Sequence, residues 1–191
     1  GKFIASFFRN PQLSDAIHDL LGQRDGLMLG ICNGFQALIK LGLVPFGEIV
    51  PMDAQCPTLT YNVIGRHQSK LVRTRVCSTL SPWLAATQVD EVYTVPISHG
   101  EGRFLAAPEL VEQLAARGQI ATQYVDLTGT PTMDAAFNPN GSICAIEGIT
   151  SPDGRVLGKM GHSERIGPKL YRNVPERCDM QLFTSAVRYF K

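Results

Sequence analysis

The stretch Gly26-Leu27-Met28-Leu29-Gly30-Ile31-Cys32-Asn33-Gly34-Phe35-Gln36 decides the fold of this chain. Its first half is a short apolar run between glycines, which is typical of a buried β-strand, although periodicity alone also admits a helix. Its second half continues with apolar residues at helical spacing, and Gly42 provides a stop signal. The stretch therefore predicts a strand that passes directly into a helix at Cys32.

Cys32 stands at the turn between these two elements in a G-x-nucleophile-x-G layout. A nucleophile on so tight a turn has strained backbone angles and is crowded by the residues two positions away, so we expect glycine at both places, Gly30 and Gly34. At a helix N-terminus the dipole favours the thiolate over the thiol, and the backbone N–H of Asn33 points toward a developing oxyanion. The competing interpretation of Cys32 is a small buried apolar residue.

Gly161-His162-Ser163-Glu164 supplies a base and a group to orient it. His162 and Glu164 follow an expected strand, and residues i and i+2 of an extended segment point the same way. Parallel strands bring their carboxyl ends to one edge of a sheet, and both Cys32 and the His162–Glu164 pair follow strands. Taken alone, His162 could be a histidine in a surface turn, and Glu164 could be a solvated partner of Arg165.

The rest of the chain adds strands and helices typical of one α/β domain over residues 1–191. Residues 71–76 alternate as a strand with two unlike faces. Residues 143–149 and 155–160 flank Ser151-Pro152-Asp153-Gly154, which predicts a hairpin. Asp179 is the expected cap of a closing helix.

Composition is ordinary, with 44% hydrophobic and 18% charged residues and a formal net charge of +1. This balance gives no reason to expect a nucleic acid or an anionic membrane as a partner. Five widely spaced cysteines without a C-x-x-C pair favour reduced thiols and no metal site. Without a signal peptide or an apolar run of about 20 residues, we expect a soluble cytoplasmic protein.

The nucleophile and the His-x-Glu pair 130 residues later resemble those of class I glutamine amidotransferases. Four segments resemble the large, fused form of phosphoribosylformylglycinamidine synthase more narrowly: residues 30–36, Pro96-Ile97-Ser98-His99-Gly100-Glu101-Gly102-Arg103-Phe104, Asn138-Pro139-Asn140-Gly141-Ser142 and residues 148–155. The likeness runs from about Gly1 to Arg165, and the closing helix resembles the end of the fused enzyme.

This resemblance implies a flavodoxin-like class I glutamine amidotransferase fold, with a mostly parallel sheet and helices on both faces. It implies hydrolysis of glutamine to glutamate and ammonia through a cysteine thioester, for the ATP-dependent amination of formylglycinamide ribonucleotide in purine biosynthesis. No cofactor is expected in this domain. ATP and magnesium are expected in a synthase region of the same complete polypeptide.

Carried onto this chain, the resemblance makes Cys32 the nucleophile, His162 the acid and base, Glu164 its orienter and the Asn33 N–H an oxyanion donor. Three further residues match segments that line the glutamine pocket in related enzymes: Gln36, Ser98 and His99. Structural roles are equally open for these, with Gln36 as an exposed helix residue and His99 as a loop residue.

Two departures from the family pattern stand out. Many relatives have proline on both sides of the histidine, whereas this chain has Gly161 and Ser163, a change that we expect to alter the turn but not the roles. The family domain also begins with a strand and a glycine-rich turn that supply a second oxyanion donor, and nothing before Ser14 resembles them. We therefore expect the sequence to begin inside the domain and to show little glutaminase activity alone.

Two rival functions follow from the same residues. The nucleophile turn does not itself specify glutamine, so a cysteine hydrolase or peptidase of the same fold family is one alternative. An inactive interaction module that holds the synthase region in place is the other. An assay of glutaminase beside amidase and peptidase substrates separates the first alternative, and the absence of a thioester on Cys32 would favour the second.

Overall fold

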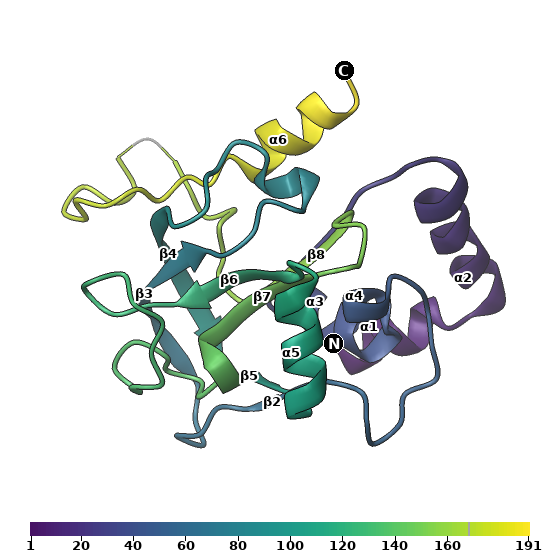
Figure 1. Cartoon of the computed structure of the whole chain (residues 1–191), viewed down its shortest axis with the longest axis horizontal. Helices are drawn as coiled ribbons and strands as arrows, with labels where there is room; N and C mark the ends of the chain where they lie inside the picture. The colour runs from purple at the N-terminus through teal and green to yellow at the C-terminus, as the bar shows by residue number, and fades with distance from the viewer. Residues whose placement is uncertain (168) are drawn as a thin grey trace.

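The computed structural model describes residues 1–167 and 169–191. A mixed six-stranded sheet forms its centre, with the strand order β1-β8-β7-β6-β3-β4 (Figure 1). Its strands are β1 (Met28–Ile31), β3 (Gln68–Val76), β4 (Val92–His99), β6 (Ile120–Tyr124), β7 (Ile146–Thr150) and β8 (Val156–Lys159). A separate antiparallel pair is formed by β2 (Thr58–Tyr61) and β5 (Glu101–Leu105).

Helices and helical turns connect and cover these strands. They are α1 (Lys2–Phe8), α2 (Pro11–His18), the π-helical turn Asp19–Gln23, α3 (Asn33–Leu41), α4 (Leu43–Phe46), the 3-10 turns Pro82–Leu84 and Ile143–Ala145, α5 (Pro108–Ala116) and α6 (Leu182–Tyr189). Among the described helices, none has the length and apolar character that crossing a membrane requires.

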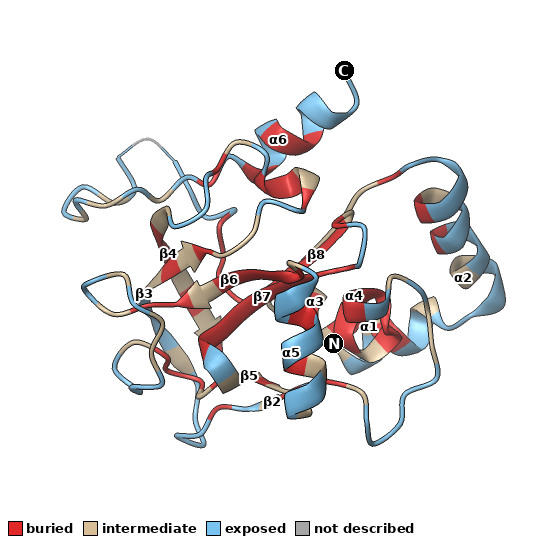
Figure 2. Cartoon of the chain, viewed as in Figure 1, coloured by how far each residue is buried: buried red, intermediate tan, exposed pale blue. Residues whose placement is uncertain are grey.

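The sheet has a hydrophobic core on each face. Phe35 and Leu38 of α3 and Leu114 of α5 belong to one core, whereas Trp83 and Leu182 belong to the other, which α6 covers. Consecutive strand residues divide between the cores, as expected for strands buried on both faces. Figure 2 shows buried residues along β6, β7 and β8 and exposed residues on the outer sides of α2 and α5.

The expectation of a mostly parallel sheet is wrong. Among the described strands, β1 and β8 are the parallel pair, whereas the β3–β4, β3–β6, β6–β7 and β7–β8 pairs are antiparallel. The reason lies in the connections, because β7 and β8 are joined by the short turn around Pro152 and Asp153, which permits only antiparallel pairing. The hairpin prediction is confirmed, and helices on both faces are confirmed as well.

Local signals place most element boundaries correctly. The helix expected after Cys32 is α3, and Gly42 ends it in the left-handed region at φ 89°. Residues 143–145, expected in a strand, instead form a 3-10 turn before β7. The closing helix begins at Leu182, with Gln181 at its N-cap, so Asp179 does not cap it directly; the Asp179 carboxylate accepts a hydrogen bond from the Gln181 N–H.

Candidate active site

Cys32 lies between the carboxyl end of β1 and the first turn of α3, in the strained conformation that the sequence predicts. Its φ is 53° and its ψ is −104°, which is a rare region for a residue with a side chain. A Cβ at Gly30 would lie 2.8 Å from the carbonyl carbon of Gly34, so crowding requires glycine there. A Cβ at Gly34 would meet nothing within 4 Å, so the expected crowding of Gly34 is wrong.

Parallel pairing of β1 with β8 brings the predicted triad to one edge of the sheet. Ile31 pairs with Lys159, and the Cys32 N–H donates to the Lys159 carbonyl at 2.8 Å, which extends the ladder to the nucleophile. His162 follows three residues after Lys159. The chain therefore leaves both strands at the same edge, as expected from their carboxyl ends.

Strand β4, the last strand of the sheet, accepts hydrogen bonds from both Cys32 and His162. The Cys32 thiol donates to the Ser98 carbonyl at 3.7 Å, and the His162 N–H donates to the Pro96 carbonyl at 2.8 Å. Carbonyls two residues apart on a strand point the same way. The last strand of the sheet thus supports the nucleophile and the base together.

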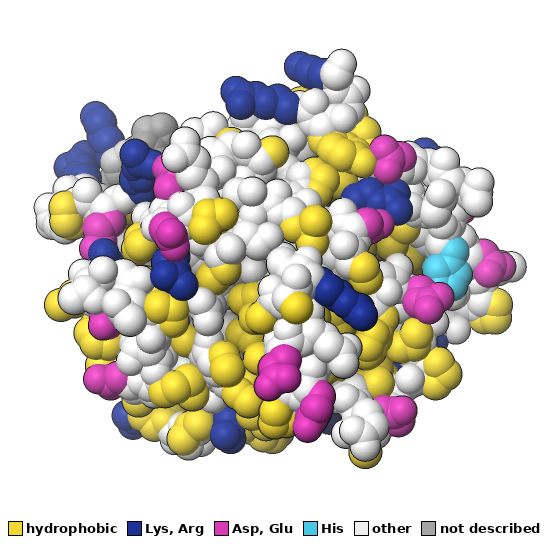
Figure 3. All heavy atoms as spheres, in the orientation of Figure 1, with side chains coloured by type: hydrophobic (Ala, Val, Ile, Leu, Met, Phe, Trp, Pro, Cys, Tyr) yellow, Lys and Arg dark blue, Asp and Glu magenta, His cyan; other side chains and the backbone are white. Residues whose placement is uncertain are grey.

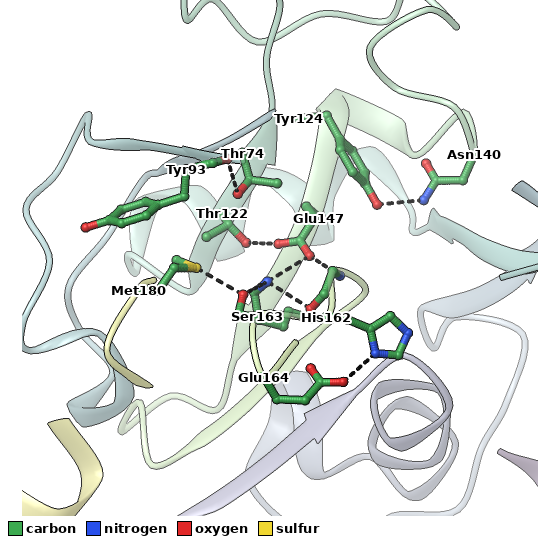
Figure 4. A network of polar contacts seen from close by, with 12 residues as sticks. Thr74, Tyr93, Thr122, Tyr124, Asn140, Glu147, His162, Ser163, Glu164 and Met180 are labelled. Atoms are coloured by element: carbon green, nitrogen blue, oxygen red, sulfur yellow. Dashed lines mark hydrogen bonds and ion pairs between the residues drawn. The ribbon is translucent and has the colours of Figure 1, made fainter. Parts of the chain in front are cut away.

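His162 and Glu164 form the expected pair, but through a turn and not through an extended segment. The Glu164 carboxylate accepts from His162 Nδ1 at 2.6 Å, and the Arg165 N–H bonds back to the His162 carbonyl at 3.0 Å. Figure 4 shows the Glu164 carboxylate pointing at the ring of His162. The other ring nitrogen, His162 Nε2, is buried and has no hydrogen-bond partner among the described residues. An oriented imidazole with a free second nitrogen suits a general base.

The thiol of Cys32 is less acidic than its position at a helix N-terminus suggests. Burial raises its pKa above the ordinary value, which outweighs the opposing effects of the Asn33 N–H and the Arg165 charge. Burial therefore opposes the expected preference for thiolate, whereas the Asn33 N–H at the helix N-terminus favours it. The Cys32 thiol, bonded to the Ser98 carbonyl, requires a base before it can attack.

The other predicted site residues lie around this centre with different surroundings. Asn33 is the first residue of α3 and is exposed. Its backbone N–H favours a lower pKa of the Cys32 thiol. Gln36 is half-buried, and its side-chain amide donates to the Glu101 carbonyl at 2.5 Å. Ser98 is half-buried, and its hydroxyl lies 3.0 Å from His67 Nε2.

His99 points into the protein interior, where it is 3% exposed. The Asn62 amide nitrogen donates to backbone carbonyls, so its Oδ1 is an acceptor and the His99 Nδ1–H, 3.2 Å away, donates to it. His99 Nε2 is then an acceptor, buried without a partner among the described residues. Burial, and secondly the charge of His67, lower the pKa of His99 to about 4.

This lowered pKa predicts a loss of stability in mild acid. Between about pH 6.5 and pH 4 the unfolded chain binds a proton at His99 that the folded chain does not, so the free energy of unfolding falls as the pH falls. Above this window both states are neutral at His99, and below it both are protonated. The expected contribution is about 3 kcal/mol. Urea unfolding from pH 7 to pH 4 checks this, with His99→Gln as the comparison. An unchanged stability difference between the two proteins across this range would contradict the prediction.

Sequence reasoning missed a buried ion pair directly behind the His162 turn. Glu147 of β7 and Lys159 of β8 are both 0% exposed, and their charged groups lie 3.2 Å apart. Neither stands in a motif that predicts a functional role, because a carboxylate and an ammonium one strand apart in a hairpin usually face solvent. The available signal in the sequence was a charged residue inside an otherwise apolar segment, as in Ile146-Glu147-Gly148-Ile149.

The described residues contain no group of three metal-ligating side chains that could hold an ion, and the five cysteines are free. On the face drawn in Figure 3, acidic and basic side chains are interspersed between hydrophobic ones.

Comparison with known proteins places this geometry in a family. Residues 1–190 match the CobB/CobQ-like glutamine amidotransferase domain. Proteins named phosphoribosylformylglycinamidine synthase subunit PurQ are similar: that of Acaryochloris marina is 40% identical over 73% of the chain and 54% of its own length, and that of Chlorobaculum tepidum is 38% identical over 75% and 56%. The chain thus spans about half the length of these relatives.

Two solved structures share the fold. In the structure of PurLQS from Thermotoga maritima, a chain is 26% identical with a TM-score of 0.71, and the match covers 98% of this chain and 72% of that one. The glutaminase domain of Trypanosoma brucei CTPS with bound acivicin is 15% identical with a TM-score of 0.50, which supports the fold alone; the match covers 96% and 78%. The class I glutamine amidotransferase fold is therefore confirmed.

Proposed function

We propose that this chain, which belongs to the CobB/CobQ-like glutamine amidotransferase domain family, hydrolyses glutamine to glutamate and ammonia through a thioester on Cys32. The observation that carries this proposal is the shared edge of β1 and β8. From this edge the chain continues into the strained cysteine after β1 and, after β8, into a histidine with one ring nitrogen bonded to Glu164 and the other without a partner among the described residues.

In the first half of the reaction, His162 Nε2 takes the proton of the Cys32 thiol as the sulfur attacks the side-chain amide carbon of glutamine. The carbonyl oxygen becomes an oxyanion, which the backbone N–H of Asn33 stabilises at the start of α3. His162 then gives its proton to the amide nitrogen, the carbon–nitrogen bond breaks, and ammonia leaves. A glutamyl thioester remains on Cys32.

In the second half, His162 accepts a proton from water, and the resulting hydroxide attacks the thioester carbon. The carbon–sulfur bond breaks, glutamate leaves, and the sulfur regains a proton from His162. Glu164 stabilises the imidazolium at both stages through its 2.6 Å bond to Nδ1. The raised pKa of the Cys32 thiol fits this order of steps, since the thiol then loses its proton only when His162 is in place to accept it.

Glutamine selection is assigned to Gln36, Ser98 and His99 in this proposal. The Ser98 carbonyl lies beside the sulfur, so this part of β4 borders the bound amide. Gln36 reaches across from α3 to the Glu101 carbonyl and forms the neighbouring wall. His99 acts indirectly: its ring is hydrogen-bonded to the Asn62 side chain, whose amide donates to the His99 carbonyl at the end of β4.

The released ammonia is proposed to serve phosphoribosylformylglycinamidine synthesis. The names of the relatives support this destination, since they are subunits of that synthase. A synthase region that binds ATP, magnesium and formylglycinamide ribonucleotide would consume the ammonia, and we place it in the same complete polypeptide. The mass of the natural protein, measured intact, tests that placement.

Trapping the thioester tests the chemistry directly. Mixing the complete protein with labelled glutamine and quenching in acid within one turnover is expected to leave label on the peptide that contains Cys32, because thioesters survive acid. Mass spectrometry of the digest locates the label. Label on another residue, or turnover of simple amides and peptides at rates comparable with glutamine, would refute the proposal in favour of a different hydrolase.

A further inference from the structure

The buried Glu147–Lys159 ion pair contacts the turn that carries His162 and Glu164 at three points. Glu147 Oε1 accepts from the Gly161 N–H at 2.5 Å. Lys159 Nζ donates to the Gly161 carbonyl at 3.1 Å and to the Ser163 hydroxyl at 2.9 Å. Figure 4 shows Glu147 and Ser163 in this network of contacts, and the ring of His162 beside the Glu164 carboxylate.

The buried Lys159 ammonium has three polar partners in this arrangement. It donates hydrogen bonds to the Gly161 carbonyl and the Ser163 hydroxyl, and it forms an ion pair with Glu147 Oε1 at 3.2 Å. Glu147 is satisfied in the same way, since its second oxygen accepts from the Thr122 hydroxyl. A fully satisfied pair of this kind is rigid, because moving either group leaves a buried charge without a partner.

The contacted atoms stand on both sides of the proposed base. Gly161 immediately precedes His162, and its N–H and its carbonyl are both held. Ser163 lies between His162 and Glu164, and its hydroxyl also donates to Met180 Sδ at 3.2 Å. From the opposite side, the Pro96 carbonyl holds the His162 N–H. The position of the imidazole is therefore set by contacts on each side.

We propose that Glu147 and Lys159 are positioning residues for glutamine hydrolysis, which hold the His162–Glu164 turn in the geometry that general-base catalysis needs. This inference rests on the proposed function. It also gives a physical reason for Gly161 and Ser163, since both supply atoms that the ion pair contacts. Proline at 161 has no N–H for Glu147, and proline at 163 has no hydroxyl for Lys159.

The packing around Gly161 supports the same assignment. A Cβ at this position would lie 2.9 Å from Glu147 Oε1, 3.2 Å from Lys159 Nζ and 2.6 Å from Val95 Cγ2. The ion pair therefore occupies the space that a side chain at 161 would take. Two hydrogen bonds from the pair hold the Gly161 backbone in place.

The test compares variants of the complete protein in which the pair or its contact with the turn is removed. Glu147→Leu with Lys159→Met replaces the pair by apolar residues of similar volume, which buried pairs often tolerate. This double variant is expected to keep a thermal midpoint near that of the unchanged protein, while kcat for glutamine hydrolysis falls about tenfold or more and KM changes by less than about twofold.

Ser163→Ala removes one of the three contacts with the turn, together with the hydroxyl bond to Met180, and leaves the ion pair in place. It is expected to lower kcat by about threefold to tenfold, while Ser163→Thr, which keeps the hydroxyl, restores most of the rate. In the Glu147→Leu/Lys159→Met background, Ser163→Ala is expected to have almost no further effect, because the Lys159 ammonium that donates to the Ser163 hydroxyl is already gone. Thr87→Val is the matched control, since it removes another buried hydroxyl bond, to the Leu84 carbonyl at 2.8 Å, outside the site.

Three results would overturn the proposal: an unchanged kcat in the double variant, an equal effect of Ser163→Ala in both backgrounds, or an equal loss of kcat with Thr87→Val. If the double variant does not fold, the test rests on the kcat of Ser163→Ala compared with the kcat of Ser163→Thr and of Thr87→Val. An unchanged kcat in Ser163→Ala then refutes the positioning role. Absence of glutaminase activity in the unchanged protein would instead refute the proposed function.

Discussion

Cys32→Ala is expected to abolish glutamine-dependent amination by the complete enzyme while leaving amination by added ammonium salts within about twofold of normal. In the proposed function the glutaminase site and the synthase site are separate, so only the supply of ammonia would depend on the sulfur. Both activities are measured on the same preparation, with glutamine or with an ammonium salt as the nitrogen source.

The structure indicates that this substitution leaves the fold intact. The Cys32 side chain does not cap α3, and the hydrogen bond that its thiol donates to the Ser98 carbonyl is a weak contact of 3.7 Å. Cys144→Ala is a close control, because Cys144 is also a free cysteine with a positive φ, of 50°, but is exposed in another region. Equal loss of both amination activities in Cys32→Ala would show that Cys32 supports the fold or the synthase chemistry instead.

His162→Ala is expected to be nearly as damaging, with a loss of about a hundredfold to ten-thousandfold in kcat for glutamine hydrolysis. The raised pKa of the Cys32 thiol makes this dependence strong, since the sulfur is not deprotonated without a base. Rapid-quench measurement of thioester formation separates the first step from hydrolysis of the thioester. Formation and breakdown at normal rates in His162→Ala would exclude His162 as the acid and base.

Glu164→Gln is expected to cause a smaller loss, on the order of tenfold to a hundredfold. The side-chain oxygen of the glutamine introduced at position 164 can still accept from His162 Nδ1, which lies 2.6 Å from the carboxylate in the unchanged protein. It brings no charge to stabilise the imidazolium. Glu109→Gln is the control, because Glu109 is an exposed carboxylate in the first turn of α5. A loss in Glu164→Gln as large as that in His162→Ala would contradict this ranking.

Much of the candidate site could be predicted from the sequence because its signals are local. The apolar run before Cys32 and the helical spacing after it identify a strand-to-helix turn, and the strained φ of 53° follows from that turn. The pairing of His162 with Glu164 was also predicted, although the two meet across a turn. The glutamine contacts of Gln36, Ser98 and His99 stay predictions.

By itself, the sequence determined most of the elements, the nucleophile turn and the hairpin, because strand and helix periods and turn residues act over a few neighbouring positions. The class of fold came from the resemblance of four segments to a known family. Only the tertiary structure decided which strands pair and in which direction, since pairing depends on contacts between residues far apart in the chain. The same contacts decided that burial raises the pKa of Cys32 and that His99 lies in the interior. They also decided that Glu147 and Lys159 are buried as an ion pair, because a charge can be buried only where the folded chain supplies its partners.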